Sequence, residues 1–212
     1  MSGPRIRPGG RRDVGTFAWA LSHAAGKAAR TEPMKLFLTL GRNRKLFRGW
    51  LRFAGRLMPR GTLPRRDTEL VILRVAHLRS CEYELVHHKR LGRRAGLSDE
   101  ELTRVVEGSA ASGWTDRERA LLAAAEALHR DGDLDDETWT ALRRHLDERE
   151  AIELCMLAGH YEMLATVIAA LPFRMAIQPI VERASQRGLR EALEVARRED
   201  APLTTPQSRQ AR

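Results

Sequence analysis

The chain has 212 residues, a mass of 24.0 kDa and a formal net charge of +9, and 42% of its residues are hydrophobic. This length and apolar content suit one folded domain and exclude a chain that is disordered throughout. No run of about 18 apolar residues predicts a membrane span, and the N-terminal arginines precede no apolar run of a secretory signal. Two cysteines, Cys81 and Cys155, cannot form a disulfide framework, so we expect a cytoplasmic protein.

Positive charge is concentrated at the N-terminal end of the chain. Residues 1–60 carry a net charge of +12, residues 61–180 carry −5 and residues 181–212 carry +2. A nucleic-acid-binding domain needs Lys and Arg clustered on its folded body. Because the region predicted to form the folded body is acidic, we expect no nucleic-acid partner and assign the positive charge to an N-terminal arm.

The first 60 residues are predicted to form a tail and a basic helical arm. Residues 1–13 are rich in Gly, Pro and Arg and predict a disordered tail. Residues 14–60 predict the helical arm, because apolar residues recur near helical spacing between the arginines of 46–58. Such a helix can lie on an acidic membrane surface. We expect instead that its apolar face packs on its own body or on a sister subunit.

A helical domain is predicted over residues 61–180, after a chain break at the sequence GTLP of 61–64. Residues 66–80 have the broad apolar face that is typical of a helix. Helix then continues or restarts from residue 81, and Gly96 is placed to end it, since glycine is the common residue just beyond a helix C-terminus.

Two capping-box sequences predict further helix starts. Ser98 is followed three residues later by Glu101, and Thr115 is followed at the same spacing by Glu118. In each pair the side chains can hydrogen-bond the free backbone amides of a first helical turn. The second pair opens a predicted helix over residues 116–130.

The remaining elements continue the helical pattern. A turn is predicted over 131–134, a helix over 135–147, and an apolar helix from about Asp147 to Pro172. Residues 181–212 are predicted to hold a short helix and a disordered tail. No segment alternates with the period of a strand, so the sequence predicts an all-α domain of about seven or eight helices.

One polar cluster has a spacing that suits chemistry. On a continuous helix, Cys81, Glu84 and His88 project from one face. A carboxylate one turn from an imidazole can orient the ring and raise its basicity, and a thiol beside that ring can lose its proton and become a nucleophile. Glu69 lies on the preceding helical segment and reaches this site only if the chain folds back.

Other interpretations of these residues remain open. A Glu–His pair at this spacing is also common on solvated helix surfaces. Cys155 lies in an apolar helix and is expected in the core. His160 and Tyr161 are either polar groups at a pocket or satisfied core groups. No metal or cofactor is predicted, because the histidines lack zinc-site spacing and the chain has no phosphate loop, GxGxxG or CxxC motif.

Residues 65–102 carry a family resemblance, in the sequence RRDTELVILRVAHLRSCEYELVHHKRLGRRAGLSDEEL. This stretch resembles the carboxymuconolactone decarboxylase superfamily, which includes the alkylhydroperoxidase D-like (AhpD-like) proteins. The motif residues are Glu69, the ILRVA-like helix, Glu84, His88 and the AGLS turn. The resemblance covers roughly residues 40–175. It implies a single AhpD-like helical domain that forms a homo-oligomer, a trimer or a hexamer.

The peroxidase branch of this superfamily uses two cysteines, a histidine and an upstream glutamate. By resemblance, Cys81 takes the first cysteine position, Glu84 the second, His88 the histidine and Glu69 the glutamate. A glutamate cannot act as a partner thiol, so an intramolecular dithiol cycle is excluded. A one-cysteine peroxidase that passes through a sulfenic acid and is reduced by an external thiol remains an alternative.

The decarboxylase branch has a glutamate followed four residues later by a histidine, which Glu84 and His88 match. The resemblance implies decarboxylation or proton transfer on a small organic acid or lactone. We expect His88 to act as general acid or base with Glu84 orienting it. Tyr83, His87 and Tyr161 are the candidate substrate-binding residues. A non-catalytic small-molecule-binding or scaffold protein is the third hypothesis.

Overall fold

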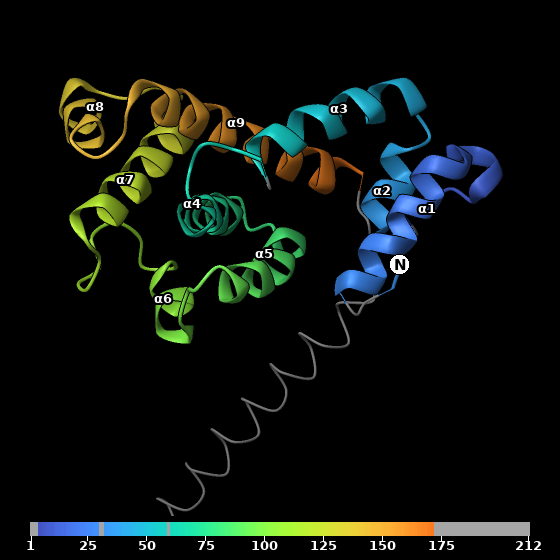
Figure 1. Cartoon of the computed structure of the whole chain (residues 1–212), viewed down its shortest axis with the longest axis horizontal. Helices are drawn as coiled ribbons and strands as arrows, with labels where there is room; N and C mark the ends of the chain where they lie inside the picture. The colour runs from blue at the N-terminus through green and yellow to red at the C-terminus, as the bar shows by residue number, and fades with distance from the viewer. Residues whose placement is uncertain (1–3, 30–31, 59, 172–212) are drawn as a thin grey trace, which may run out of the picture. The chain divides into compact units, whose positions relative to one another are not determined.

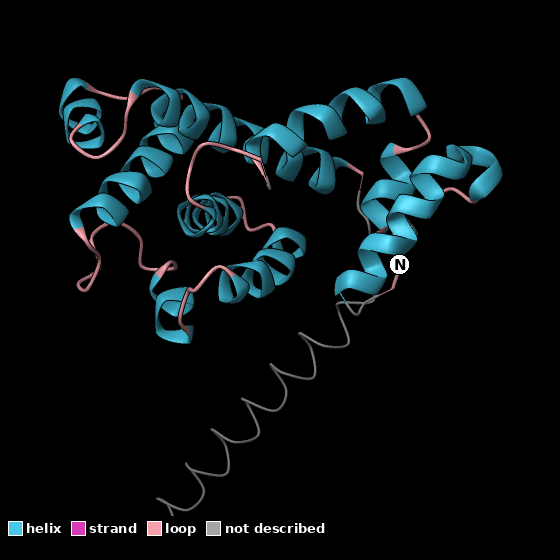
Figure 2. Ribbon diagram, in the orientation of Figure 1, coloured by secondary structure: helices cyan, strands magenta, loops and turns pink. Residues whose placement is uncertain are grey.

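The computed structural model describes residues 4–29, 32–58 and 60–171. These residues form nine α-helices and no strand (Figures 1 and 2), which confirms the predicted all-α class. The expected number, about seven or eight, was too low because the segment 33–58 folds into two helices, α2 (Lys35–Leu40) and α3 (Arg44–Leu57). Asn43 starts the second of them, since its side chain accepts a hydrogen bond from the backbone N–H of Leu46 at 3.2 Å.

The first helix, α1 (Arg11–Ala29), begins three residues earlier than the predicted tail over 1–13 allows. At its start the carboxylate of Asp13 accepts a hydrogen bond from the N–H of Gly10 at 2.8 Å. Just before it, the N–H of Gly9 donates to the carbonyl of Leu38 at 3.0 Å. The later part of the predicted tail is therefore ordered against the arm, because these local hydrogen bonds hold it there.

Helix α4 (Arg65–Leu78) occupies the centre of the domain and contacts α5 (Glu82–Arg94), α7 (Asp116–Asp131) and α9 (Glu148–Ala170). Figure 1 shows α4 end-on between these three helices. Every residue from 67 to 76 is buried, including the charged ones. A helix that is enclosed on all sides has no solvated stripe, which explains why its apolar face is so broad in sequence.

A tight turn joins α4 to α5. The N–H of Ser80 donates to the carbonyl of His77 at 2.9 Å, and the N–H of Cys81 donates to that of Ala76 at 2.8 Å. This is the Schellman pattern, and Ser80 adopts the left-handed conformation it requires, with φ of 49°. The turn folds α5 back along α4, which is the condition under which Glu69 can reach His88.

Local capping signals place the next helices as expected. Both predicted capping boxes are present, at the starts of α6 (Asp99–Arg104) and α7, and Gly96 ends α5 with φ of 94°. Helix α8 (Asp136–Arg143) is shorter than the predicted 135–147, because the carbonyl of Leu142 is taken by a turn that leads into α9. Residues 172–212, with the predicted short helix and tail, lie outside the described residues.

The basic arm packs on its own domain, one of the two expected arrangements. Its helices share a core of Val14, Ala18 and Phe47, and α3 lies along α9. The ring of Trp50 stacks on that of His160 with centroids 6.0 Å apart. Through these contacts the arm packs against α9.

Helix α9 is the one helix of the described residues that is long and apolar enough, by length and composition, to cross a membrane. The same composition suits a helix at the centre of a packed domain. Here α9 contacts α3, α4 and α7, and its Leu154, Leu157 and Leu164 are buried.

Candidate active site

His88 lies between two carboxylates. Its Nδ1 is 2.7 Å from Oε2 of Glu69, and its Nε2 is 3.1 Å from Oε2 of Glu84. The three side chains come from α4 and α5, and each is at most 4% exposed. The structure thus brings together three of the four residues predicted to act, and both nitrogens of the imidazole are occupied.

The carboxylates control the charge of His88. Burial by itself lowers the pKa of this imidazole, but the hydrogen bonds to Glu69 and Glu84 outweigh it and raise the pKa to about 9. At neutral pH the ring is therefore an imidazolium that donates a hydrogen bond to each carboxylate. Glu69 also pairs with Arg65, one turn earlier on α4. The result is a series of side chains of alternating charge, Arg65, Glu69, His88 and Glu84, of which all but the partly exposed Arg65 are buried.

A cavity of about 410 Å³ adjoins this chain, a volume suited to a small organic ligand. The arm and the helices α5 and α9 enclose it. Most of its lining is apolar, from residues that include Phe37, Trp50 and Leu164. Its polar lining comprises Tyr83, Glu84, His87, His88, Arg90, Arg94, His160 and Tyr161.

Four residues that line the cavity each carry one buried polar atom without a hydrogen-bond partner among the described residues. These atoms are Nε1 of Trp50, the hydroxyl of Tyr83, Oε1 of Glu84 and Nδ1 of His160. A buried polar group without a partner costs about 1–3 kcal/mol, and such groups are rare in native folds. Four around one cavity therefore indicate a space suited to a polar molecule.

The predicted binding residues Tyr83, His87 and Tyr161 all line the cavity. The ring of Tyr161 meets His88 edge-on, with centroids 5.1 Å apart, and its hydroxyl donates to the sulfur of Met58 at 3.0 Å. Burial lowers the pKa of His87, which favours its neutral form. These three residues are thus close to Glu84 and His88, as the sequence suggested.

Cys81 differs from the helical expectation. It is the N-cap residue of α5, with non-helical backbone angles, so the spacing of a continuous helix does not by itself fix the direction of its thiol. It is buried and is absent from the cavity lining. Burial also raises the pKa of this thiol. Cys155, expected in the core, is partly buried in α9.

Sequence reasoning missed the contribution of the arm to this site. Trp50 and Phe37 line the cavity although they lie 30 or more residues before Glu84. His160, left open between pocket and core, lines it too, and burial lowers its pKa. The apolar face of residues 46–58 was the only signal of this contribution, and the sequence does not show which part of the domain that face covers.

Among the described residues, no group of three or more His, Cys, Asp or Glu side chains is arranged to hold a metal ion.

Comparison with known proteins agrees with the motif residues. Residues 44–127 match the Carboxymuconolactone decarboxylase family. No curated relative matches the chain. Among solved structures, the AhpD core of an uncharacterized peroxidase-related protein from Ralstonia eutropha JMP134 is 18% identical with a TM-score of 0.72, over 82% of this chain and 93% of that one.

Two further structures share the fold. The debrominase Bmp8 is 20% identical with a TM-score of 0.70, over 84% of this chain and 95% of that one. A putative antioxidant defence protein AhpD from Agrobacterium tumefaciens is 19% identical with a TM-score of 0.58, over 62% of this chain and 90% of that one. At these identities the likeness concerns the fold.

Proposed function

We propose that this chain, whose residues 44–127 match the Carboxymuconolactone decarboxylase family, is an enzyme that moves protons on a small organic acid or lactone bound beside Glu84. One observation carries this proposal. One carboxylate oxygen of Glu84 is held by His88, whereas the other is buried at the cavity without a partner. A carboxylate in that position is ready to accept a hydrogen bond, or a proton, from a ligand.

The geometry favours a division of roles opposite to the one expected from sequence. His88 has both nitrogens engaged by carboxylates, so neither lone pair is free to take a proton from a ligand. Glu84 therefore exchanges the proton, and His88 is the positioning residue that holds it. Glu69 in turn holds the imidazolium and is itself paired with Arg65, so the charges alternate along this series of side chains.

The same arrangement serves two related reactions. In proton transfer, Glu84 takes a proton from the carbon beside a carbonyl group, and the electron pair of the broken C–H bond moves onto the carbonyl oxygen. In decarboxylation, the electron pair of the broken C–C bond moves onto that oxygen as carbon dioxide leaves, and the carbon then takes a proton through Glu84. In both reactions the N–H of Trp50 and the O–H of Tyr83 are donors available to the negative oxygen.

The experiment follows deuterium incorporation and carbon dioxide release by NMR, with a panel of lactones and β-keto acids. We expect wild type to turn over a member of the panel and Glu84→Gln to lower kcat by about 10²- to 10⁴-fold. Cys81→Ser is the matched control, because it alters the same helix start at a residue that does not line the cavity. Full turnover by Glu84→Gln on a substrate of the wild type would refute the proposal.

The alternative, a one-cysteine peroxidase, has a separate test. It requires hydroperoxide consumption with an external thiol that disappears in Cys81→Ser. The burial of Cys81, its raised pKa and its absence from the cavity lining argue against this activity. Specific ligand binding without turnover in either assay would instead favour the third hypothesis, a binding protein.

A further inference from the structure

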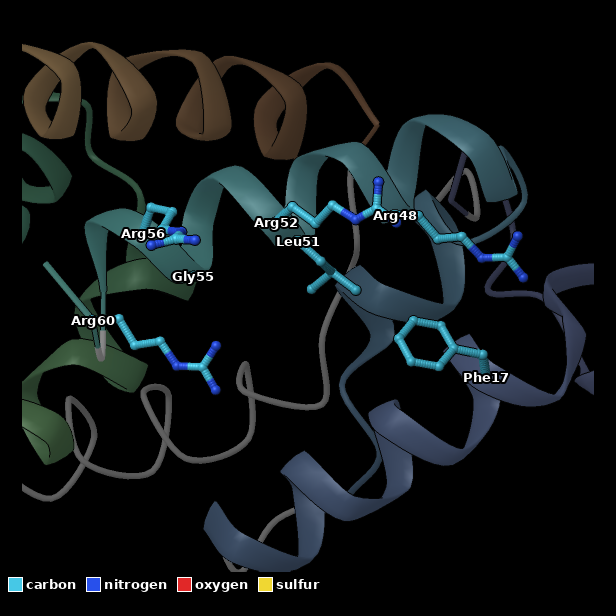
Figure 3. A pocket seen from close by; sticks show the side chains of 7 residues that line it. All are labelled: Phe17, Arg48, Leu51, Arg52, Gly55, Arg56 and Arg60. Atoms are coloured by element: carbon cyan, nitrogen blue, oxygen red, sulfur yellow. The ribbon is translucent and has the colours of Figure 1, made fainter.

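A second hollow lies on the solvent side of α3. It has a volume of about 640 Å³ and lies between α3 and α1 (Figure 3). We call it the arginine groove, and its lining residues are Phe17, Arg48, Leu51, Arg52, Gly55, Arg56 and Arg60. None of the lining residues is acidic, so all the charged side chains around the hollow are positive.

The arginines of the groove follow a helical repeat. Arg48, Arg52 and Arg56 are four residues apart on α3, and Arg60 follows the helix at the same interval. Side chains at this spacing lie along one face, and like charges there repel one another. Arg48 and Arg56 are separated by about 12 Å along the helix axis at 1.5 Å per residue. The groove thus offers several cations in a row.

These four side chains are exposed and have no ion pair or hydrogen bond within the described part of the chain. Arginines elsewhere behave differently: Arg74 pairs with Glu126, and Arg117 pairs with Asp67 and Glu150. The groove arginines therefore do not serve to hold the fold together. Their guanidinium donors are free to bind an anion from solution.

Apolar walls complete the groove. Phe17 of α1 is 53% exposed, and Figure 3 shows its ring across the hollow from α3, with Leu51 directed into the space between them. Leu51 and Gly55 also line the cavity beside Glu84, so the two hollows share these two residues of α3. A side chain at Gly55 would meet no atom within 4 Å, so packing does not require glycine there.

We propose that the arginine groove binds a soluble, multiply charged, phosphate-bearing small molecule. Guanidinium groups bind phosphate oxygens through paired, charge-assisted hydrogen bonds. Because the arginines are spread along the helix, a ligand with several phosphate groups contacts more of them than a single phosphate does. The arginines line one side of a concave hollow that has an aromatic wall, a shape that suits a small molecule better than a flat membrane surface. This proposal does not depend on the reaction at Glu84.

The test is calorimetric titration with inorganic tripolyphosphate at about 0.15 M salt, where weak surface attraction is screened. Wild type is compared with Arg52→Gln/Arg56→Gln and with the control Arg144→Gln/Arg149→Gln. The control removes the same charge from exposed arginines at α8 and α9, away from the groove. We expect wild type and the control variant to bind tripolyphosphate. The affinity of the groove variant for tripolyphosphate should be about tenfold or more weaker, and wild type should bind inorganic phosphate more weakly than tripolyphosphate.

Three outcomes would overturn the proposal. The first is no binding of tripolyphosphate by wild type at millimolar concentration. The second is an equal loss of affinity in both variants, which would indicate attraction by net charge alone. The third is binding to vesicles of phosphatidylglycerol and phosphatidylcholine without binding of tripolyphosphate, which would identify a membrane surface. Thermal unfolding of each variant checks that a change in affinity does not arise from misfolding. The single variant Arg56→Gln is titrated in the same way as a milder change.

Discussion

Helices α3 and α4 both carry many charged residues, but they use them in opposite ways. On α4 the charged residues Asp67, Glu69 and Arg74 are buried, and each pairs with a partner on another helix. On α3 the arginines of the groove are exposed and unpaired within the described residues. Burial makes an unpaired charge very costly, whereas exposure to water does not. Charge on α4 is therefore part of the structure, and charge on α3 is available to a ligand.

The largest expected effect comes from removing a buried charge of α4. Arg74 pairs with Glu126 and donates to the carbonyls of Val105 and Val106. Arg74→Ala leaves these acceptors without their donor, and we expect the free energy of unfolding to fall by about 3–5 kcal/mol. Urea denaturation measures this free energy of unfolding. Arg56→Ala on α3 is the matched control and should change stability by less than about 0.5 kcal/mol. Similar losses of stability in the two variants would contradict the difference between the charges of α4 and those of α3.

The next effect is a dependence of stability on pH through His88. The pKa of His88 is about 9 in the folded protein and 6.5 in its reference state, so the folded protein binds this proton more tightly than the unfolded chain does. The resulting stability is fully present below about pH 6.5 and is lost as pH rises through 9, by roughly 3 kcal/mol in all. Denaturation at a series of pH values should show this slope in wild type. If His88→Gln retained the same slope between pH 6.5 and 9, another group would be responsible.

A smaller effect is expected at the turn between α4 and α5. Ser80 holds a positive φ that glycine adopts at less cost. We expect Ser80→Gly to raise the free energy of unfolding by up to about 1 kcal/mol, offset in part by the greater freedom of glycine in the unfolded chain. The midpoint of thermal unfolding shows whether the stability of the variant rises or falls. A marked loss of stability would mean that the serine side chain contributes more than the backbone conformation costs.

The smallest effect concerns the repulsion along α3. Arg52→Gln relieves like-charge contacts with Arg48 and Arg56, so we expect a gain of about 0.2–0.5 kcal/mol at low ionic strength. Salt screens such exposed charges, and the gain should vanish near 0.5 M sodium chloride. Thermal midpoints at the two salt concentrations measure the difference. A loss of stability at low salt would show that Arg52 makes a favourable contact within the folded protein.

Local signals in the sequence were sufficient for several parts of the fold. The capping boxes at Ser98 and Thr115 and the helix end at Gly96 were predicted correctly, because each depends on residues a few positions apart. The pair of Glu84 and His88 was found for the same reason, since i, i+4 spacing on a helix brings two side chains together. The late part of the tail and the end of α8 were misjudged, because single hydrogen bonds decide such boundaries.

The amino-acid sequence by itself determined the all-α class, the start of most helices, the basic arm and the adjacency of Glu84 to His88, because helical periodicity and capping are local properties. Only the tertiary structure decided that Glu69 reaches His88, that Cys81 lies outside the cavity lining, and that Trp50 of the arm lies inside it. These relations join residues far apart in the chain or depend on one turn at Ser80. They follow from how the helices pack, which no local pattern specifies.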